Sequence, residues 1–128
     1  MPLVKIEILE GRPAAEKKAL LDAVHSALVE ALKIPEHDRM QILHEHPPEA
    51  FEIPPGKTEK YTVVEVTLFP GRSLDAKRRL YQSIIRNFGA AGITPPNVFI
   101  VIHEPAMENF GVRGVPASEI DLGFEVRV

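Results

Sequence analysis

Residues 2–12 read Pro-Leu-Val-Lys-Ile-Glu-Ile-Leu-Glu-Gly-Arg, and this stretch decides the fold. Apolar and charged residues alternate along it, which predicts a β-strand over residues 3–9 with one buried face. A Gly-Arg-Pro sequence ends the strand, and Pro13 suits the first turn of a helix. Apolar residues at helical spacing then predict that helix over about residues 13–32.

The same pattern occurs again in the second half of the chain. A strand is predicted over residues 39–45 and a proline-rich loop over 47–58. Strand, helix and strand then follow over 61–69, about 74–88 and 97–103. The register of this repeat holds across a whole unit, which indicates two tandem β-α-β units. Seven residues recur 60 positions later (Val4, Ile6, Ile8, Gly11, Arg12, Lys17 and Leu20 as Val64, Val66, Leu68, Gly71, Arg72, Lys77 and Leu80), and four recur 59 positions later (His44, Glu45, Glu49 and Phe51 as His103, Glu104, Glu108 and Phe110).

Two such units predict an α/β (α+β) fold, with a four-stranded sheet and two helices on one face. We expect a single domain over residues 1–128, with unit one at about 2–58 and unit two at about 59–110. The tail, 111–128, is predicted to form turns and a last edge strand over 122–128. The sheet face without helices also carries apolar residues. Another copy of the chain would cover it, which predicts a homo-oligomer with a sheet-lined centre.

Composition excludes several classes of function. The chain has 128 residues, a net charge of −3 and no cysteine, so nothing favours nucleic acid, an anionic membrane or thiol chemistry. No segment reads as a signal peptide or a membrane span, which predicts a soluble cytoplasmic domain. His37, His44 and His46 lie near one another in sequence, but no further ligand has a persuasive spacing. We therefore predict no metal site.

Pro2 is the first candidate for chemistry. A proline directly after the initiator methionine is normally exposed when the methionine is trimmed, and the new terminus is a secondary amine. The pKa of an α-amino group lies near ~8, and burial beside arginines would lower it toward the value that suits a base at neutral pH. Proton transfer at a carbon next to a carbonyl needs such a base. If Met1 remains, the Pro2 nitrogen is an amide and cannot act.

Charged and aromatic residues near the predicted strands are further candidates. Arg72 follows a strand, where its planar guanidinium could bind a carboxylate, although a solvated turn arginine is the alternative. Arg12 occupies the equivalent point of unit one. Asp38 precedes the second strand and could hold the amine protonated or position a water, or it could simply bond to nearby backbone. Phe110 and Phe69 could wall an apolar pocket, although aromatic residues at such positions are more often core.

These residues resemble the tautomerase superfamily, which is built from β-α-β units with an amino-terminal proline. Residues 2–12 are similar to the opening of 4-oxalocrotonate tautomerase, and Phe110-Gly111-Val112 resembles the Phe-Gly turn of that family. The fused length and the segment Asp38-Arg39-x-Gln41-Ile42 resemble malonate semialdehyde decarboxylase and its relatives. Gly71-Arg72-Ser73 is similar to the family segment that carries a substrate-binding arginine.

The resemblance implies a role for each matching residue. Pro2 would be the catalytic amine, and Arg72 would bind a substrate carboxylate. Asp38 would orient or activate a water, as in the decarboxylase-like members. Arg12 matches the carboxylate-binding arginine of the short tautomerases. The resemblance also implies a trimer.

Two positions depart from the family pattern. Pro70 stands where many decarboxylase relatives carry a second arginine, and Phe99 stands where the short tautomerases carry another. The loss of a second anchor argues against dicarboxylate substrates. The sequence thus predicts a cofactor-independent keto-enol tautomerase that acts on a small carboxylate-bearing carbonyl compound. Decarboxylation of a 3-oxo acid such as malonate semialdehyde, or hydration, is the enzymatic alternative, and a non-catalytic trimeric interaction protein is the other.

Overall fold

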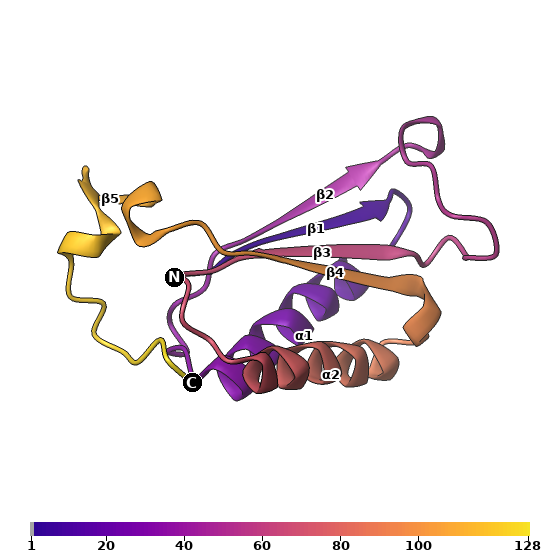
Figure 1. The fold of residues 1–128 in the computed structure, drawn as a ribbon. Helices are drawn as coiled ribbons and strands as arrows, with labels where there is room; N and C mark the ends of the chain where they lie inside the picture. Colours follow the sequence, from indigo (N-terminus) through magenta and orange to yellow (C-terminus); the bar gives the residue numbers. More distant parts are fainter. Residues whose placement is uncertain (1) are drawn as a thin grey trace.

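The computed structural model describes residues 2–128. Met1, whose removal decides whether Pro2 carries a free amine, lies outside the described residues. Figure 1 shows two layers, a twisted sheet and a pair of helices beneath it. The helices are α1 (Ala14–Leu32) and α2 (Leu74–Ala90), and the strands of the main sheet are β1 (Leu3–Leu9), β2 (Gln41–His46), β3 (Thr62–Thr67) and β4 (Val98–His103). No helix within the described chain is long and apolar enough to cross a membrane.

The main sheet has the strand order β2-β1-β3-β4 and confirms the two β-α-β units. Each unit contributes one parallel pair, and the two units join through the antiparallel pair of β1 and β3. At the centre of that pair Lys5 lies opposite Glu65, which is 60 positions later in the sequence. The spacing of the repeat therefore makes this pair the centre of an approximate two-fold axis. Since β1 and β3 run in opposite directions, the end of each strand lies beside the start of the other.

The core lies between the sheet and the helices. Alternate strand residues face the helices, as the period-2 pattern predicts, and pack on the apolar stripes of α1 and α2. A fully buried aliphatic side chain of this kind contributes about 1.5–3 kcal/mol through removal from water. The residues at the centre of the core are at most 2% exposed (Val4, Ile6, Ile8, Val64 and Val66 from the strands; Leu68 just after β3; Leu20, Val24, Leu28, Leu80, Ile84 and Phe88 from the helices).

The opposite face of the sheet has no helix over it (Figure 1). Ile42 and Phe99 on this face keep 42% and 53% of their surface exposed. The same face also carries hydrogen-bonded polar side chains. The Glu7 carboxylate lies 2.7 Å from Nδ1 of His44 and 2.6 Å from Nε2 of His46. Burial opposes ionisation of Glu7, but these hydrogen bonds and the histidine charges outweigh it and hold the pKa of Glu7 below its ordinary value.

The tail differs from the sequence prediction in one respect, although the fold class is as predicted. Residues 122–128 form no strand, and the strands after β4 are instead those of a short hairpin, β5 (Gly111–Val112) and β6 (Val115–Pro116). The tail packs on its own chain because Phe124 and Val128 contact the core. The backbone carbonyl of Val128 also accepts a hydrogen bond of 2.7 Å from the Ser73 hydroxyl. These contacts hold the end of the tail beside the start of α2, and the tail adds no strand to the main sheet.

Candidate active site

Pro2 is buried at the start of β1. It faces the helices, because Val4 and Ile6 follow it at strand period. In the antiparallel register Leu3 pairs with Thr67, so Pro2 lies opposite Leu68, just beyond the end of β3. Arg72 follows four residues later in the turn to α2. The register therefore brings Pro2 and Arg72, 70 positions apart in the sequence, to the same end of the sheet.

Arg72 is 6% exposed. Its Nη1 donates to the carbonyl of Phe69 at 3.1 Å, whereas Nε and Nη2 are buried and find no acceptor within the described chain. Burial lowers the pKa of the Arg72 guanidinium, while the charges of Glu104 and Asp38 raise it. The group still carries its charge at neutral pH because an arginine is not deprotonated in proteins. A buried cation with two unpaired donors is costly, and a carboxylate is the ligand whose geometry satisfies both donors.

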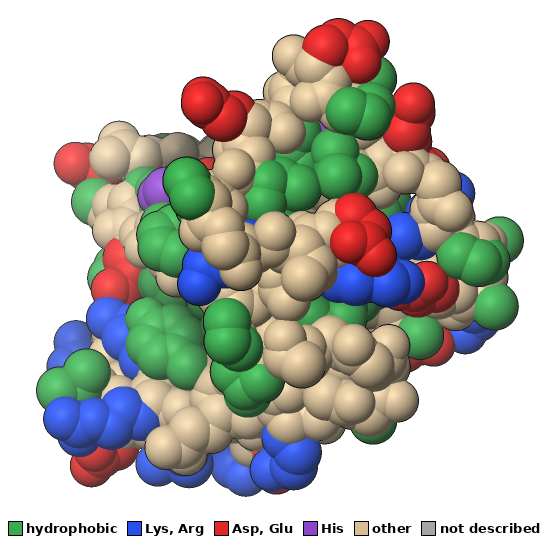
Figure 2. Space-filling model, turned by 90° about the vertical axis from the view of Figure 1, so that its right-hand side faces the viewer, with side chains coloured by type: hydrophobic (Ala, Val, Ile, Leu, Met, Phe, Trp, Pro, Cys, Tyr) green, Lys and Arg blue, Asp and Glu red, His purple; other side chains and the backbone are tan. Residues whose placement is uncertain are grey.

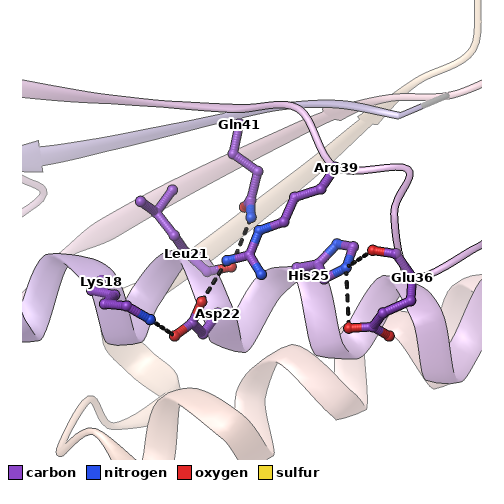
Figure 3. Close-up of polar contacts among 7 residues, drawn as sticks. All are labelled: Lys18, Leu21, Asp22, His25, Glu36, Arg39 and Gln41. Carbon is purple, nitrogen blue, oxygen red and sulfur yellow. Dashed lines mark hydrogen bonds and ion pairs between the residues drawn. The ribbon is translucent and has the colours of Figure 1, made fainter.

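Asp38 lies in the segment between α1 and β2. Its backbone N–H donates to the carbonyl of Pro35 at 3.0 Å, and its charge acts on Arg72. The residues on both sides of Asp38 are also bonded to α1, and this fixes the backbone that carries the carboxylate. Three contacts to α1 do this, as Figure 3 shows: Nε2 of His25 lies 2.8 Å from the Glu36 carbonyl, Arg39 donates to Asp22, and Nε2 of Gln41 donates to the Leu21 carbonyl at 2.8 Å.

A cavity of about 330 Å³ opens at this end of the sheet. Asp38 and Phe69 form one wall, and the hairpin and the tail form the other, which includes Leu122 and Phe124. Phe110 packs edge-to-face on Phe69 with ring centroids 4.7 Å apart, so it supports this wall from behind. The size suits a small organic molecule, and the lining combines apolar side chains with the charged groups of Asp38, Arg113 and Asp121.

The structure brings Pro2, Asp38 and Arg72 to one end of the sheet. Phe110 lies at this end too, because its ring packs on that of Phe69. Arg12 lies at the other end of β1. The strand is seven residues long, which corresponds to roughly 23 Å. Within one chain, Arg12 and Pro2 therefore lie at opposite ends of β1 and do not share a site.

Sequence reasoning missed Arg113, which also lines the cavity. Arg113 and Gly114 form the two-residue turn between β5 and β6, with φ of 51° and 84°. Such turns favour Asn-Gly or Gly-Gly, so an arginine at the first position is unusual. The short sequence Val-Arg-Gly-Val was the available signal, but its placement beside the cavity depends on tertiary packing.

Comparison with known proteins places these features in context. Two family models, each described as "Tautomerase enzyme", match residues 38–113 and residues 2–55. A probable tautomerase of Bacillus subtilis (strain 168), YrdN, is 32% identical over 110 residues, which cover 81% of this chain and 84% of that protein.

Two solved structures are similar as well. A crystal structure of malonate semialdehyde decarboxylase, whose description cites decarboxylase and hydratase activities, has a TM-score of 0.79 and 28% identity over 84% of this chain and 88% of that one. A fused 4-OT described as a symmetric trimer has a TM-score of 0.79 and 28% identity over 91% of this chain and 96% of that one.

Proposed function

The chain belongs to the tautomerase family, and from that premise we propose that it is a cofactor-independent enzyme that interconverts the keto and enol forms of a small carboxylate-bearing carbonyl compound. One observation carries the proposal: Pro2 is buried at the end of the sheet where the unpaired Nε and Nη2 of Arg72 also lie. A substrate carboxylate on Arg72 would hold the reacting carbon near Pro2, at the end of the sheet where the cavity lined by Asp38 and Phe69 also lies.

Pro2 acts as the base in this mechanism once Met1 has been removed. Its burial disfavours the charged amine, and the Arg72 charge does the same, so the amine is neutral at the pH where it must accept a proton. It removes a proton from the carbon next to the carbonyl. The electrons of that C–H bond form the C=C bond of the enol, and the carbonyl oxygen takes up the negative charge. The protonated amine then returns its proton to the other end of the conjugated system.

Decarboxylation of a 3-oxo acid is the second candidate. Asp38 favours it, because a fixed carboxylate at the cavity would hold Pro2 protonated. A protonated amine polarises the 3-oxo group, and the electrons of the breaking C–C bond then flow into an enolate as CO₂ leaves. The similarity to malonate semialdehyde decarboxylase supports this candidate.

Assembly is part of the proposal. The sheet face without helices exposes Ile42 and Phe99, and a fused relative is described as a symmetric trimer. We infer that three copies meet through this face, which removes its apolar surface from water. A non-catalytic interaction protein would use the same face. It would not need a buried arginine with unpaired donors, so the Arg72 environment favours an enzyme.

The proposal is tested with an assay of 2-oxo acids, dienols and 3-oxo acids, together with an intact-mass measurement. We expect the purified chain to lack Met1 and to turn over one of these classes, and Pro2→Ala to lose most of that activity. Turnover of a dienol or 2-oxo acid supports tautomerisation, and turnover of a 3-oxo acid alone supports decarboxylation. Full retention of Met1, or full activity in Pro2→Ala, contradicts the role of the amine.

A further inference from the structure

We propose that residues 124–128 form a strap that closes over the turn carrying Arg72 and opens to admit the substrate carboxylate. The inference rests on the proposed function for the identity of that ligand alone, because the closure itself is a property of the fold. Three features of the chain carry it: the inaccessibility of Arg72, the contacts of the strap, and the open state of the equivalent turn in unit one.

Arg72 is closed off in this structure. Its Nε and Nη2 are buried and have no acceptor among residues 2–128. The cavity at the same end of the sheet is lined by Asp38 and Phe69, but the Arg72 side chain is not part of its lining. A carboxylate in that cavity would therefore not meet the two donors. Part of the chain has to move before Arg72 can bind a ligand, as it does where a lid covers a site.

The strap lies against this turn. A side-chain carbon placed on Gly71 would lie 3.4 Å from Cγ1 of Val126. On the other side of Arg72, the Ser73 hydroxyl donates to the Val128 carbonyl at 2.7 Å. The strap therefore contacts the residues before and after Arg72. Figure 1 shows the tail crossing from the hairpin to the helix layer at this end of the molecule.

The equivalent turn of unit one is open. Apart from its neighbours in the chain, a side-chain carbon placed on Gly11 would have no described atom within 4 Å. A cavity of about 190 Å³ adjoins this turn and is lined by Gly11, Arg12 and Pro13 themselves. Figure 2 faces this end of the molecule, where acidic and basic side chains both lie around apolar surface. Since the approximate two-fold axis relates the two turns, it predicts a similar cavity beside Gly71 and Arg72, and the strap lies there instead.

The strap is held by few contacts. It belongs to neither sheet, so no backbone ladder ties it to the body of the chain. Phe124 and Val128 pack on the core, and within residues 2–128 the bond from Ser73 is the one hydrogen bond that joins the strap to other residues. Segments with so few contacts open at a free energy well below that of global unfolding. Gly123 precedes the strap with a φ of 76°, and its lack of a side chain lets the backbone change direction there.

Opening is favoured by the group that it exposes. In the closed form Arg72 is a buried cation with two unpaired donors, which costs free energy. In the open form a carboxylate can satisfy both with two parallel charge-assisted bonds, because Nε and Nη2 lie on one edge of the guanidinium. A ligand that binds only the open form shifts the equilibrium toward it, and the closed fraction lowers the apparent affinity. The strap therefore controls access to Arg72.

A reversible lock on the strap tests this inference. The chain has no cysteine, and the Ser73 side chain lies 2.7 Å from the Val128 backbone, so the double variant Ser73→Cys, Val128→Cys places one disulfide between strap and turn. Phenylglyoxal, which modifies accessible guanidinium groups, is applied to the oxidised and the reduced protein, and the labelled arginines are identified by peptide mass. Arg72 should be labelled at least about tenfold more slowly in the oxidised protein, because labelling requires the open form. Arg12 lies at the other end of the sheet and is the control, with equal rates in both states.

Val126→Ala provides a test that does not depend on disulfide formation. It removes Cγ1, the atom that lies against Gly71, and leaves the bond from Ser73 in place. The loss of this half-buried apolar contact should raise the labelling rate of Arg72 about threefold. Val115→Ala is the matched control, because it makes the same change at a valine of β6 that is 42% exposed. Val115→Ala should label like wild type.

The outcomes separate the strap from the proposed function. Equal labelling of Arg72 in the oxidised and reduced protein overturns the strap and leaves the active-site proposal intact; if the disulfide does not form, wild-type labelling in Val126→Ala does the same. A titration of both forms with pyruvate, followed by amide chemical shifts of ¹⁵N-labelled protein, adds the ligand. The reduced protein should bind pyruvate at least about tenfold more tightly than the oxidised protein. If labelling of Arg72 follows the strap but pyruvate binds neither form, the strap stands and the carboxylate role of Arg72 is wrong.

Discussion

Arg72 and Asp38 are held in place by different means. Arg72 is confined by burial: Nη1 donates to the Phe69 carbonyl, and Nε and Nη2 have no acceptor among residues 2–128. Asp38 is confined through its neighbours, which bond to α1 on both sides (Figure 3). The resemblance assigned Pro2 and Arg72 to one site, but the repeat alone did not bring them together, because their proximity depends on the antiparallel pairing of β1 with β3. The contacts that fix Asp38 were not predictable, since they join residues whose distances depend on how α1 packs on the sheet.

Replacing Arg72 tests its role as the carboxylate anchor. Arg72→Ala should lower kcat/KM for a carboxylate substrate by about 2 kcal/mol or more in transition-state binding, because a charge-assisted bidentate pair is lost. Arg72→Lys should restore only part of this, since the planar fork is absent. Arg78→Ala, at an exposed arginine of α2, is the control and should match wild type. Unchanged kcat/KM in Arg72→Ala would remove Arg72 from the site.

Asp38→Asn separates the two candidate reactions because it keeps the shape of the side chain and removes its charge. If neutral Pro2 performs tautomerisation, the loss of the charge should cost little or should help the amine remain neutral. If protonated Pro2 performs decarboxylation, the same change should depress turnover strongly. Steady-state rates of wild type and Asp38→Asn, measured with dienols or 2-oxo acids and with 3-oxo acids, distinguish the two reactions. A robust decarboxylation that collapses in Asp38→Asn would reverse the ranking given above.

The secondary-structure elements follow from the sequence wherever one face is buried and the other is not. The strands were predicted to within two residues at each end because a shift of one residue would move every core side chain to the wrong face. Residues 122–128 had the apolar alternation of a strand but form none. Burial of Phe124 and Val128 and the bond from Ser73 determine their path, and neither signal is local in sequence.

Ser73 joins the start of α2 to the tail and should be important for stability. Its Oγ accepts from the Ala76 N–H at 3.1 Å as an N-cap and donates to the Val128 carbonyl. Ser73→Ala should therefore lower the free energy of unfolding by about 1 kcal/mol, the typical loss for an N-cap. Urea denaturation measures this change. Ser26→Ala is the control, because Ser26 is exposed in the middle of α1, where alanine favours the helix. Equal stability of the two variants would show that the cap contributes nothing.

At the scale of the whole molecule, the two-fold axis gives the chain two similar ends and one uncovered sheet face. The N-terminus, hairpin and tail gather at one end, and the loop before β3 lies at the other (Figure 1). The repeat predicted the two units and the uncovered face. It did not predict that Arg12 and Pro2 would lie at opposite ends within one chain, because that follows from the antiparallel pairing of β1 with β3.

A charge on the uncovered face should disrupt assembly. Phe99→Asp places a carboxylate at a site that the proposed trimer buries, so sedimentation velocity should show a shift toward monomer. Leu74→Asp is the matched control, because Leu74 is equally apolar and 61% exposed but lies on α2, away from this face. Leu74→Asp should sediment like wild type. The same sedimentation in Phe99→Asp, or a monomeric wild type at micromolar concentration, contradicts assembly through the sheet.

The central claim is that Pro2 carries a free amine that is neutral when it meets its substrate. A titration of protein labelled with ¹⁵N-proline tests this directly, since the terminal nitrogen of Pro2 reports its own protonation. The account predicts a titrating secondary amine with a pKa below the ~8 of an ordinary α-amino group, because burial and the Arg72 charge both disfavour the protonated form. Activity should rise with pH through the same value. A Pro2 nitrogen that does not titrate, or one whose pKa in the folded protein is at or above that of the unfolded chain, would contradict the account.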